Sequence, residues 1–126
     1  MDNLLFEYAV IRFMPKVERQ EFINVGVILF CKDLGFLQIK YHLNANKILA
    51  IAPQFEVAEI EQNLQAFQKI CSGETSGGPI GELPPAERFR WLTATRSTIL
   101  QSSKVHPGLC KKPELALQKL FQDLVG

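Results

Sequence analysis

The sequence lacks most of the features that assign a chain to a class of protein on sight. No apolar run approaches the roughly 20 residues that cross a bilayer, so we expect no membrane-spanning segment. The three cysteines, Cys31, Cys71 and Cys110, form no CxxC pair. The two histidines, His42 and His106, are not at metal-ligand spacing. We therefore expect no metal site, no cofactor, and free thiols suited to the reducing cytoplasm.

A large charge of one sign is also missing. Lys and Arg number 14 against 13 Asp and Glu, which leaves a net charge of +1 and no overall field to attract nucleic acid or anionic lipid. The glycines of 77–81 have neither the spacing of a dinucleotide fingerprint nor a following Gly-Lys-Ser/Thr. The first residues, Met1-Asp2-Asn3, are acidic rather than basic, so we expect no signal peptide. Composition thus favours a cytoplasmic protein that binds neither membrane nor nucleic acid.

The stretch 22–31, FINVGVILFC, is the most strongly β-prone run in the chain, and the rest is organised around it. Side chains alternate between the two faces of a strand, so Val25 and Val27 are predicted to share one wholly apolar face. That face should pack on helices and bury Val27 completely. Asn24 and Gly26 interrupt the other face. A close approach by a neighbouring strand or a ligand is one reason for a glycine in a central strand.

Periodicities of two and of 3.6 residues divide the remaining sequence into strands and helices. Strands are predicted over about 6–13, 22–31, 36–41 and 95–103, and helices over 45–52, 57–71, 86–92 and 113–125. A loop rich in Gly and Pro is expected over 72–85, and irregular backbone over 104–112. The order predicts one α+β domain over 1–126. Its four-stranded, mainly antiparallel sheet joins a three-strand meander to a late strand, with helices packed on one face.

Polar residues that could form a ligand site occur near the predicted sheet and the following helix. They are Arg12, Glu21, Asn24, Arg88, Arg96 and Ser97. Guanidinium groups bind phosphate and carboxylate in a bidentate manner, so these residues could hold such a ligand if they met at one end of the sheet. The alternative is Arg–Glu pairing that orients the hairpin around Arg12 and the helix around Arg88.

A possible general base is His106, because a histidine changes charge near neutral pH and the following Pro107 would fix its backbone. The alternative is a hydrogen-bonded structural histidine. No nucleophile can be assigned to it, since Ser102, Ser103 and Cys110 are merely close in the chain. The sequence therefore does not decide whether the protein is an enzyme.

Several separated segments carry a family resemblance. They read YAVIRFMP, VERQEFINVGVILFC, GGPIG, ERFRWLTATRSTILQ and VHPGL. Through them the chain resembles the bacterial domain of unknown function numbered 3037. Members of that family are often encoded beside kinase-like proteins of the persistence-toxin type, so the resemblance implies a protein partner of that kind. It supplies no catalytic residues, because none are established for the family.

Two functions follow as hypotheses. The first is a small cytoplasmic module that binds or regulates a protein partner. The second is a small enzyme or sensor for a phosphate-bearing ligand at the Arg/Asn/Glu corner. A binding module should expose an apolar patch or a free strand edge, whereas an enzyme should gather its polar residues in a concave pocket.

Overall fold

The computed structural model describes residues 3–16, 21–73, 78–94 and 99–125. Its strands are β1 (Leu4–Lys16), β2 (Glu21–Cys31), β3 (Phe36–Tyr41), β4 (Leu100–Ser102) and β5 (His106–Cys110). Its helices are α1 (Ala45–Ile51), α2 (Val57–Ser72), α3 (Gly78–Gly81), α4 (Pro85–Thr93) and α5 (Pro113–Leu124), and a 3₁₀ turn, η2 (Lys32–Leu34), joins β2 to β3. Among these residues, no helix has the length and apolarity to cross a bilayer.

The five strands form one antiparallel sheet in the order β3-β2-β1-β4, and β5 also pairs with β1. Thus β4 and β5 follow one another along the same edge of the long strand β1. Ser103 joins these two strands: its backbone N–H donates to Val10 O at 2.8 Å, and its hydroxyl accepts from Val10 N at 2.9 Å. The buried serine therefore pairs the backbone of β1 where the regular ladder is interrupted.

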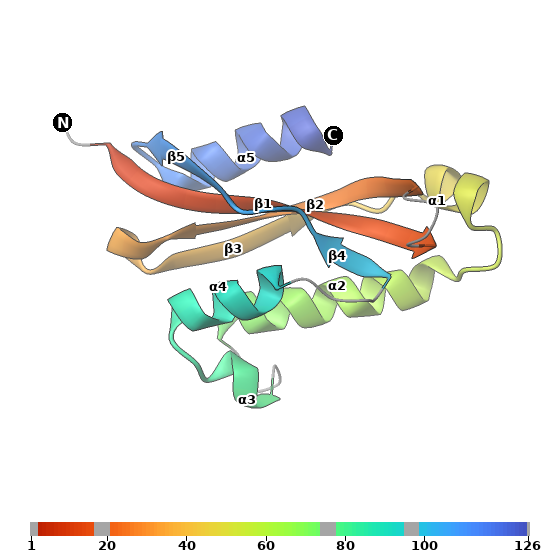
Figure 1. The fold of residues 1–126 in the computed structure, drawn as a ribbon, viewed down its shortest axis with the longest axis horizontal. Coiled ribbons are helices and arrows are strands. Elements are labelled where there is room, and N and C mark those ends of the chain that lie inside the picture. The colour runs from red at the N-terminus through yellow and green to blue at the C-terminus, as the bar shows by residue number, and fades with distance from the viewer. Residues whose placement is uncertain (1–2, 17–20, 74–77, 95–98, 126) are drawn as a thin grey trace.

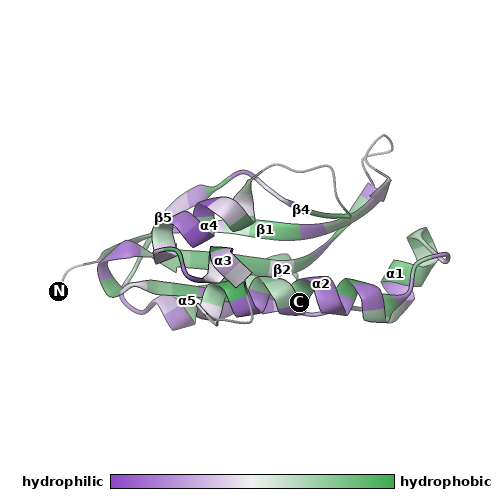
Figure 2. Cartoon of the chain, turned by 90° about the horizontal axis from the view of Figure 1, so that it is seen from below, coloured by the Kyte–Doolittle hydropathy of each residue, from purple (hydrophilic) through white to green (hydrophobic). Residues whose placement is uncertain are grey.

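Helices cover both faces of the sheet (Figure 1). Residues of α1, α2 and α4, among them Ile48, Leu64 and Phe89, pack on one face. On the other face, Leu117 and its neighbours in α5 pack on Phe6, Leu29 and other residues. The strands are largely apolar, whereas the helices carry both apolar and polar residues (Figure 2). This is the pattern of a sheet buried between amphipathic helices.

A β-bulge in β2 changes which residues face each helix layer. Ile11 pairs with Gly26 but Arg12 pairs with Asn24, so Val25 is an extra residue. As a result, Val25 lies in the core against α1 and α2, while Val27 lies in the core against α5. The expectation that these two valines share a face is wrong, because the bulge reverses the alternation between them. The expectation that Val27 is fully buried is confirmed, since its side chain is 0% exposed.

The glycine at the bulge is explained by a neighbouring strand. A Cβ added to Gly26 would lie 3.0 Å from Tyr41 Cβ and 3.1 Å from Lys40 O, both on β3. The close approach expected at this position is therefore made by β3.

The predicted α+β class, the three-strand meander and the late strand β4 are confirmed. Two details differ. The irregular backbone expected over 104–112 contains β5, because a proline is tolerated at the outer edge of a sheet. Helix α5 covers the face opposite α1, α2 and α4, so the helices do not all lie on one face. Within the expected loop 72–85, the short helix α3 forms; residues 74–77 and 95–98 lie outside the described part.

Candidate functional site

Arg12 and Asn24, which lie on consecutive strands of the predicted meander, are paired across β1 and β2. The Asn24 amide donates from Nδ2 to Leu124 O, at the end of α5, over 3.1 Å. The Arg12 guanidinium carbon lies 4.5 Å from the centre of the Phe22 ring, which is close enough for a cation–π interaction. We call Arg12, Asn24, Phe22 and the Leu124 carbonyl the polar corner.

Two buried atoms of the polar corner have no hydrogen-bond partner among the described residues: Arg12 Nε, a donor, and Asn24 Oδ1, an acceptor. Buried polar atoms are nearly always paired in native proteins, so two such atoms on adjacent strands require an explanation. Nε needs a group that accepts a hydrogen bond, and Oδ1 needs a group that donates one. This is the feature of the corner that a ligand or an ordered water can use.

The other residues expected at the corner are only partly placed there. Glu21 is exposed at the start of β2 and is the Cα partner of Lys16. Arg96 and Ser97 lie outside the described residues. Gln101 of β4, which the sequence did not single out, is the register partner of Arg12 on its other side. The structure thus brings Arg12, Asn24 and Gln101 together across three strands.

Arg88 lies on the other side of the sheet from the polar corner and bonds to backbone carbonyls. Its Nη1 donates to Ile70 O at 2.7 Å and to Cys71 O at 2.8 Å, at the C-terminus of α2. Its Nε donates to Leu83 O at 2.8 Å, just before α4. A cation that bonds the last carbonyls of a helix stabilises that helix end and complements its dipole. Arg88 therefore does not lie beside Arg12, and its contacts are those of a structural residue.

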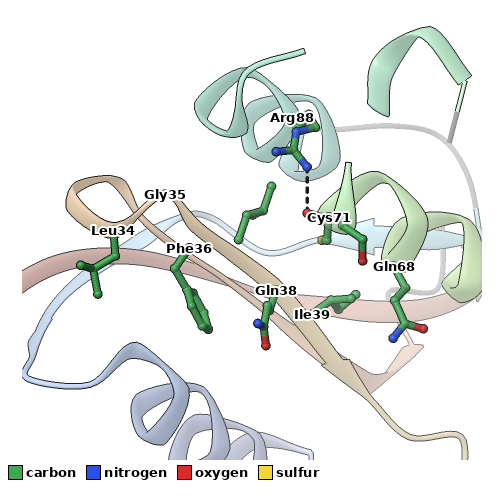
Figure 3. A pocket seen from close by; sticks show the side chains of 10 residues that line it. Leu34, Gly35, Phe36, Gln38, Ile39, Gln68, Cys71 and Arg88 are labelled. Atoms are coloured by element: carbon green, nitrogen blue, oxygen red, sulfur yellow. Dashed lines mark hydrogen bonds between the residues drawn. The ribbon is translucent and has the colours of Figure 1, made fainter. Parts of the chain in front are cut away.

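A groove of about 610 Å³ lies beside Arg88 and β3 (Figure 3). Its walls include Phe36 and Ile39 of the β2–β3 hairpin, Gln68 and Cys71 of α2, and Arg88 of α4. Burial raises the pKa of the Cys71 thiol to about 12, against the opposing effect of the Arg88 charge. A thiol with that pKa stays protonated at neutral pH, so Cys71 is not an activated nucleophile.

His106 lies on β5 and is exposed. Its ring centre is 5.4 Å from that of Tyr8, its register partner on β1. Tyr8 and Arg12 are four residues apart on β1, which is about 13 Å at 3.3 Å per residue, so His106 is not part of the polar corner. The nearby Ser103 hydroxyl is occupied, because it donates to Lys104 O and accepts from Val10 N.

Two surface features lie outside the predicted polar site. The first is the outer edge of β3, the last strand on that side of the sheet among the described residues. The second is a group of four leucines, each 57–65% exposed: Leu5, Leu34, Leu109 and Leu115. Leu5 and Leu109 are register partners, while Leu34 and Leu115 line one groove of about 410 Å³. The segments that carry them meet at one end of the molecule, where β1 and α5 begin (Figure 1). We call this group the leucine end.

The described residues thus define a small α+β protein with an open sheet edge and an apolar end. The residues predicted to form one ligand site lie apart: Arg12 and Asn24 at the polar corner, and Arg88 and His106 elsewhere. The chain belongs to the family described as protein of unknown function DUF3037, whose family model matches residues 8–125. This match covers nearly the whole chain and confirms the family expected from the sequence. Neither a curated protein nor a solved structure matches the chain.

Proposed function

We propose that this protein is a cytoplasmic module that binds a protein partner through the leucine end. The observation that carries the proposal is the exposure of four large apolar side chains at one end of a 126-residue protein. Single exposed leucines are ordinary, but exposed leucines that share a groove, as Leu34 and Leu115 do, are typical of protein interfaces. The three free cysteines are compatible with a reducing cytoplasm. The partner expected from the family resemblance is a kinase-like protein encoded nearby.

The groove between Leu34 and Leu115 indicates which side chains the partner segment should carry. Lys111 and Lys112 line the same groove, and both are exposed. The groove is lined by apolar side chains together with two lysines and one carboxylate, Glu114. This lining fits a partner segment that carries large apolar side chains and an excess of acidic residues. The apolar contacts would supply most of the affinity, and the lysines would mainly orient the partner and raise the association rate.

The test is a titration of the purified protein with the purified kinase-like protein, followed by calorimetry. Leu115→Glu should weaken binding at least tenfold, because it places a charge in the apolar contact. Leu49→Glu is the matched control, since Leu49 is also an exposed helical leucine, 44% exposed, but lies in α1 at the opposite end. Absence of binding by the parent, or equal losses in both variants, would contradict the proposal.

A second candidate is a sensor of a phosphate-bearing ligand at the polar corner. It is favoured by the unpaired buried donor Arg12 Nε, which can bond to a phosphate oxygen. If it is correct, inorganic phosphate should raise the melting temperature of the parent and not that of Arg12→Met. Arg90→Met, a loss of one exposed arginine from α4, is the control and should keep the phosphate response.

If the polar corner is only structural, phosphate should leave all three melting temperatures unchanged. Arg12→Met should then alter the free energy of unfolding by no more than about 1 kcal/mol, because it removes a cation–π contact but also an unpaired buried donor. We expect this structural outcome.

A further inference from the structure

The outer edge of β3 presents backbone groups that could pair with another strand. Among the described residues, β2 is the strand that pairs with β3. The His42 N–H, just after β3, donates to Val25 O of β2 at 2.8 Å. Backbone groups of an antiparallel strand alternate in direction, so those of Lys40 and Gln38 also face β2. The N–H and C=O groups of Leu37, Ile39 and Tyr41 therefore face outward.

Features that usually protect a strand edge are few here. Its register with β2 is regular, without a bulge, and the sequence FLQIKY contains no proline. The one charged side chain is Lys40, whose Nζ lies 5.1 Å from the centre of the Phe121 ring on α5. Grooves lie beside the edge on both faces. The groove of about 610 Å³ lies near α2 (Figure 3), and another of about 280 Å³ lies near α5.

We propose that two copies of this protein associate through β3, in antiparallel pairing around a two-fold axis at Ile39. In this register, Leu37 of one copy lies opposite Tyr41 of the other, and Ile39 lies opposite itself. These are the outward-facing residues, so roughly six backbone hydrogen bonds would form between the copies. The two sheets would become one continuous sheet. This self-association is separate from the proposed binding of a protein partner, which uses the leucine end.

Side-chain charges of β3 are compatible with this register. Lys40 of one copy lies opposite Gln38 of the other, so no two lysines face each other. Gln38 lines the groove near α5 together with Glu114, which places the second copy's Lys40 close to a carboxylate. The sequence of β3 is thus self-complementary about its central isoleucine.

Helix α2 is self-complementary about the same axis. The Tyr41 hydroxyl donates to Glu61 Oε1 at 3.2 Å, and Gln68 lines the groove beside Leu37 and Ile39, so α2 runs alongside β3 in the opposite direction. In the dimer the two α2 helices would lie antiparallel, with their centres near Gln65. Glu61 and Lys69 stand four residues on either side of Gln65, so each copy's Glu61 would face the other copy's Lys69.

The test uses opposite charge changes at Gln38, which is exposed and directed away from the α2 core. Sedimentation equilibrium of the parent should give a dimer. Gln38→Lys places two lysine pairs across the axis and should weaken the dimer about three- to tenfold, whereas Gln38→Glu should tighten it by a similar factor. Gln54→Lys, the same change at an exposed position between α1 and α2, should have no effect.

Amide hydrogen exchange supplies a second measurement, in which alternate residues of β3 should behave differently. The amides of Leu37, Ile39 and Tyr41 should gain protection as the protein concentration rises, while those of Gln38 and Lys40 should be protected at all concentrations by β2. A monomeric parent, equal dimer affinities in all variants, or protection at Leu37 and Ile39 that does not depend on concentration would each overturn the proposal. None of these outcomes involves the kinase-like partner, so the two proposals fail separately.

Discussion

Among the described residues, the sheet ends in β3 on one side and in β4 and β5 on the other. The two sides differ in the backbone N–H and C=O groups that are available to bond to a further strand. On β1, Val10 bonds to Ser103, so by alternation Tyr8 and Phe6 face β5 and pair with His106 and Gly108. The residue between, Pro107, faces outward and has no N–H to donate.

The β5 edge also depends on a glycine. An added Cβ at Gly108 would run into the ring of Phe6, so the ring packs directly over the backbone of β5. By contrast, β3 has six residues and no proline, and in three alternate residues both the donor and the acceptor group face outward. The outward edge of β5 thus lacks a donor at Pro107, whereas the outward edge of β3 lacks none. The difference indicates that an association by strand pairing would use β3.

The most damaging change to this arrangement is in β2, which supports β3. Val27→Asp should prevent folding, because an unpaired buried charge costs several kcal/mol against a total stability of about 5–15 kcal/mol. Val105→Asp is the control, since Val105 is 38% exposed between β4 and β5. Circular dichroism melts of the soluble fractions decide the matter. A cooperative melt of Val27→Asp near the parent temperature would show that the sheet is not held as described.

A smaller effect is expected at the helix that borders the open edge. Arg88→Met removes three bonds to carbonyls that end α2 beside β3, and should lower the free energy of unfolding by about 2–4 kcal/mol. Arg90→Met in the same helix should change it by less than about 0.5 kcal/mol. Urea unfolding gives both values. Equal small losses would mean that Arg88 does not hold α2 and α4 together.

The sequence was sufficient for the elements whose periodicity is regular. The apolar stripe of α2 and the alternation in β3 fixed these segments within a residue or so of the observed bounds. It was insufficient where a single residue changes the pattern. The bulge at Val25 reverses the alternation of faces along β2. Pro107 and Gly108 made 104–112 read as irregular backbone, although both residue types are tolerated in an outer strand such as β5.

The candidate site was predictable to a similar extent. Arg12 and Asn24 face each other because a hairpin makes consecutive strands neighbours. The position of Arg88 was not predictable, since its partners are carbonyl groups, which every residue has, and no side-chain pattern marks them. The alternation over 36–41 predicts a half-buried strand near an edge of the sheet, and the observed strand order agrees with this.

The smallest effect on stability is expected from Pro107→Thr, yet this change tests the comparison of the two edges most directly. Threonine suits a strand and restores an outward-facing N–H, so the free energy of unfolding should change by less than about 0.5 kcal/mol.

The consequence of Pro107→Thr should appear in how the protein assembles. A protein with open edges on both sides of its sheet can pair through β3 and β5 in turn, which gives open-ended chains rather than a closed dimer. Sedimentation velocity should therefore show species larger than the parent, increasing with concentration. Pro53→Thr, at an exposed turn after α1, should leave the size unchanged. If Pro107→Thr sediments as the parent does, the proline is not what closes the β5 edge, and the packing of Phe6 over Gly108 is left as the cause.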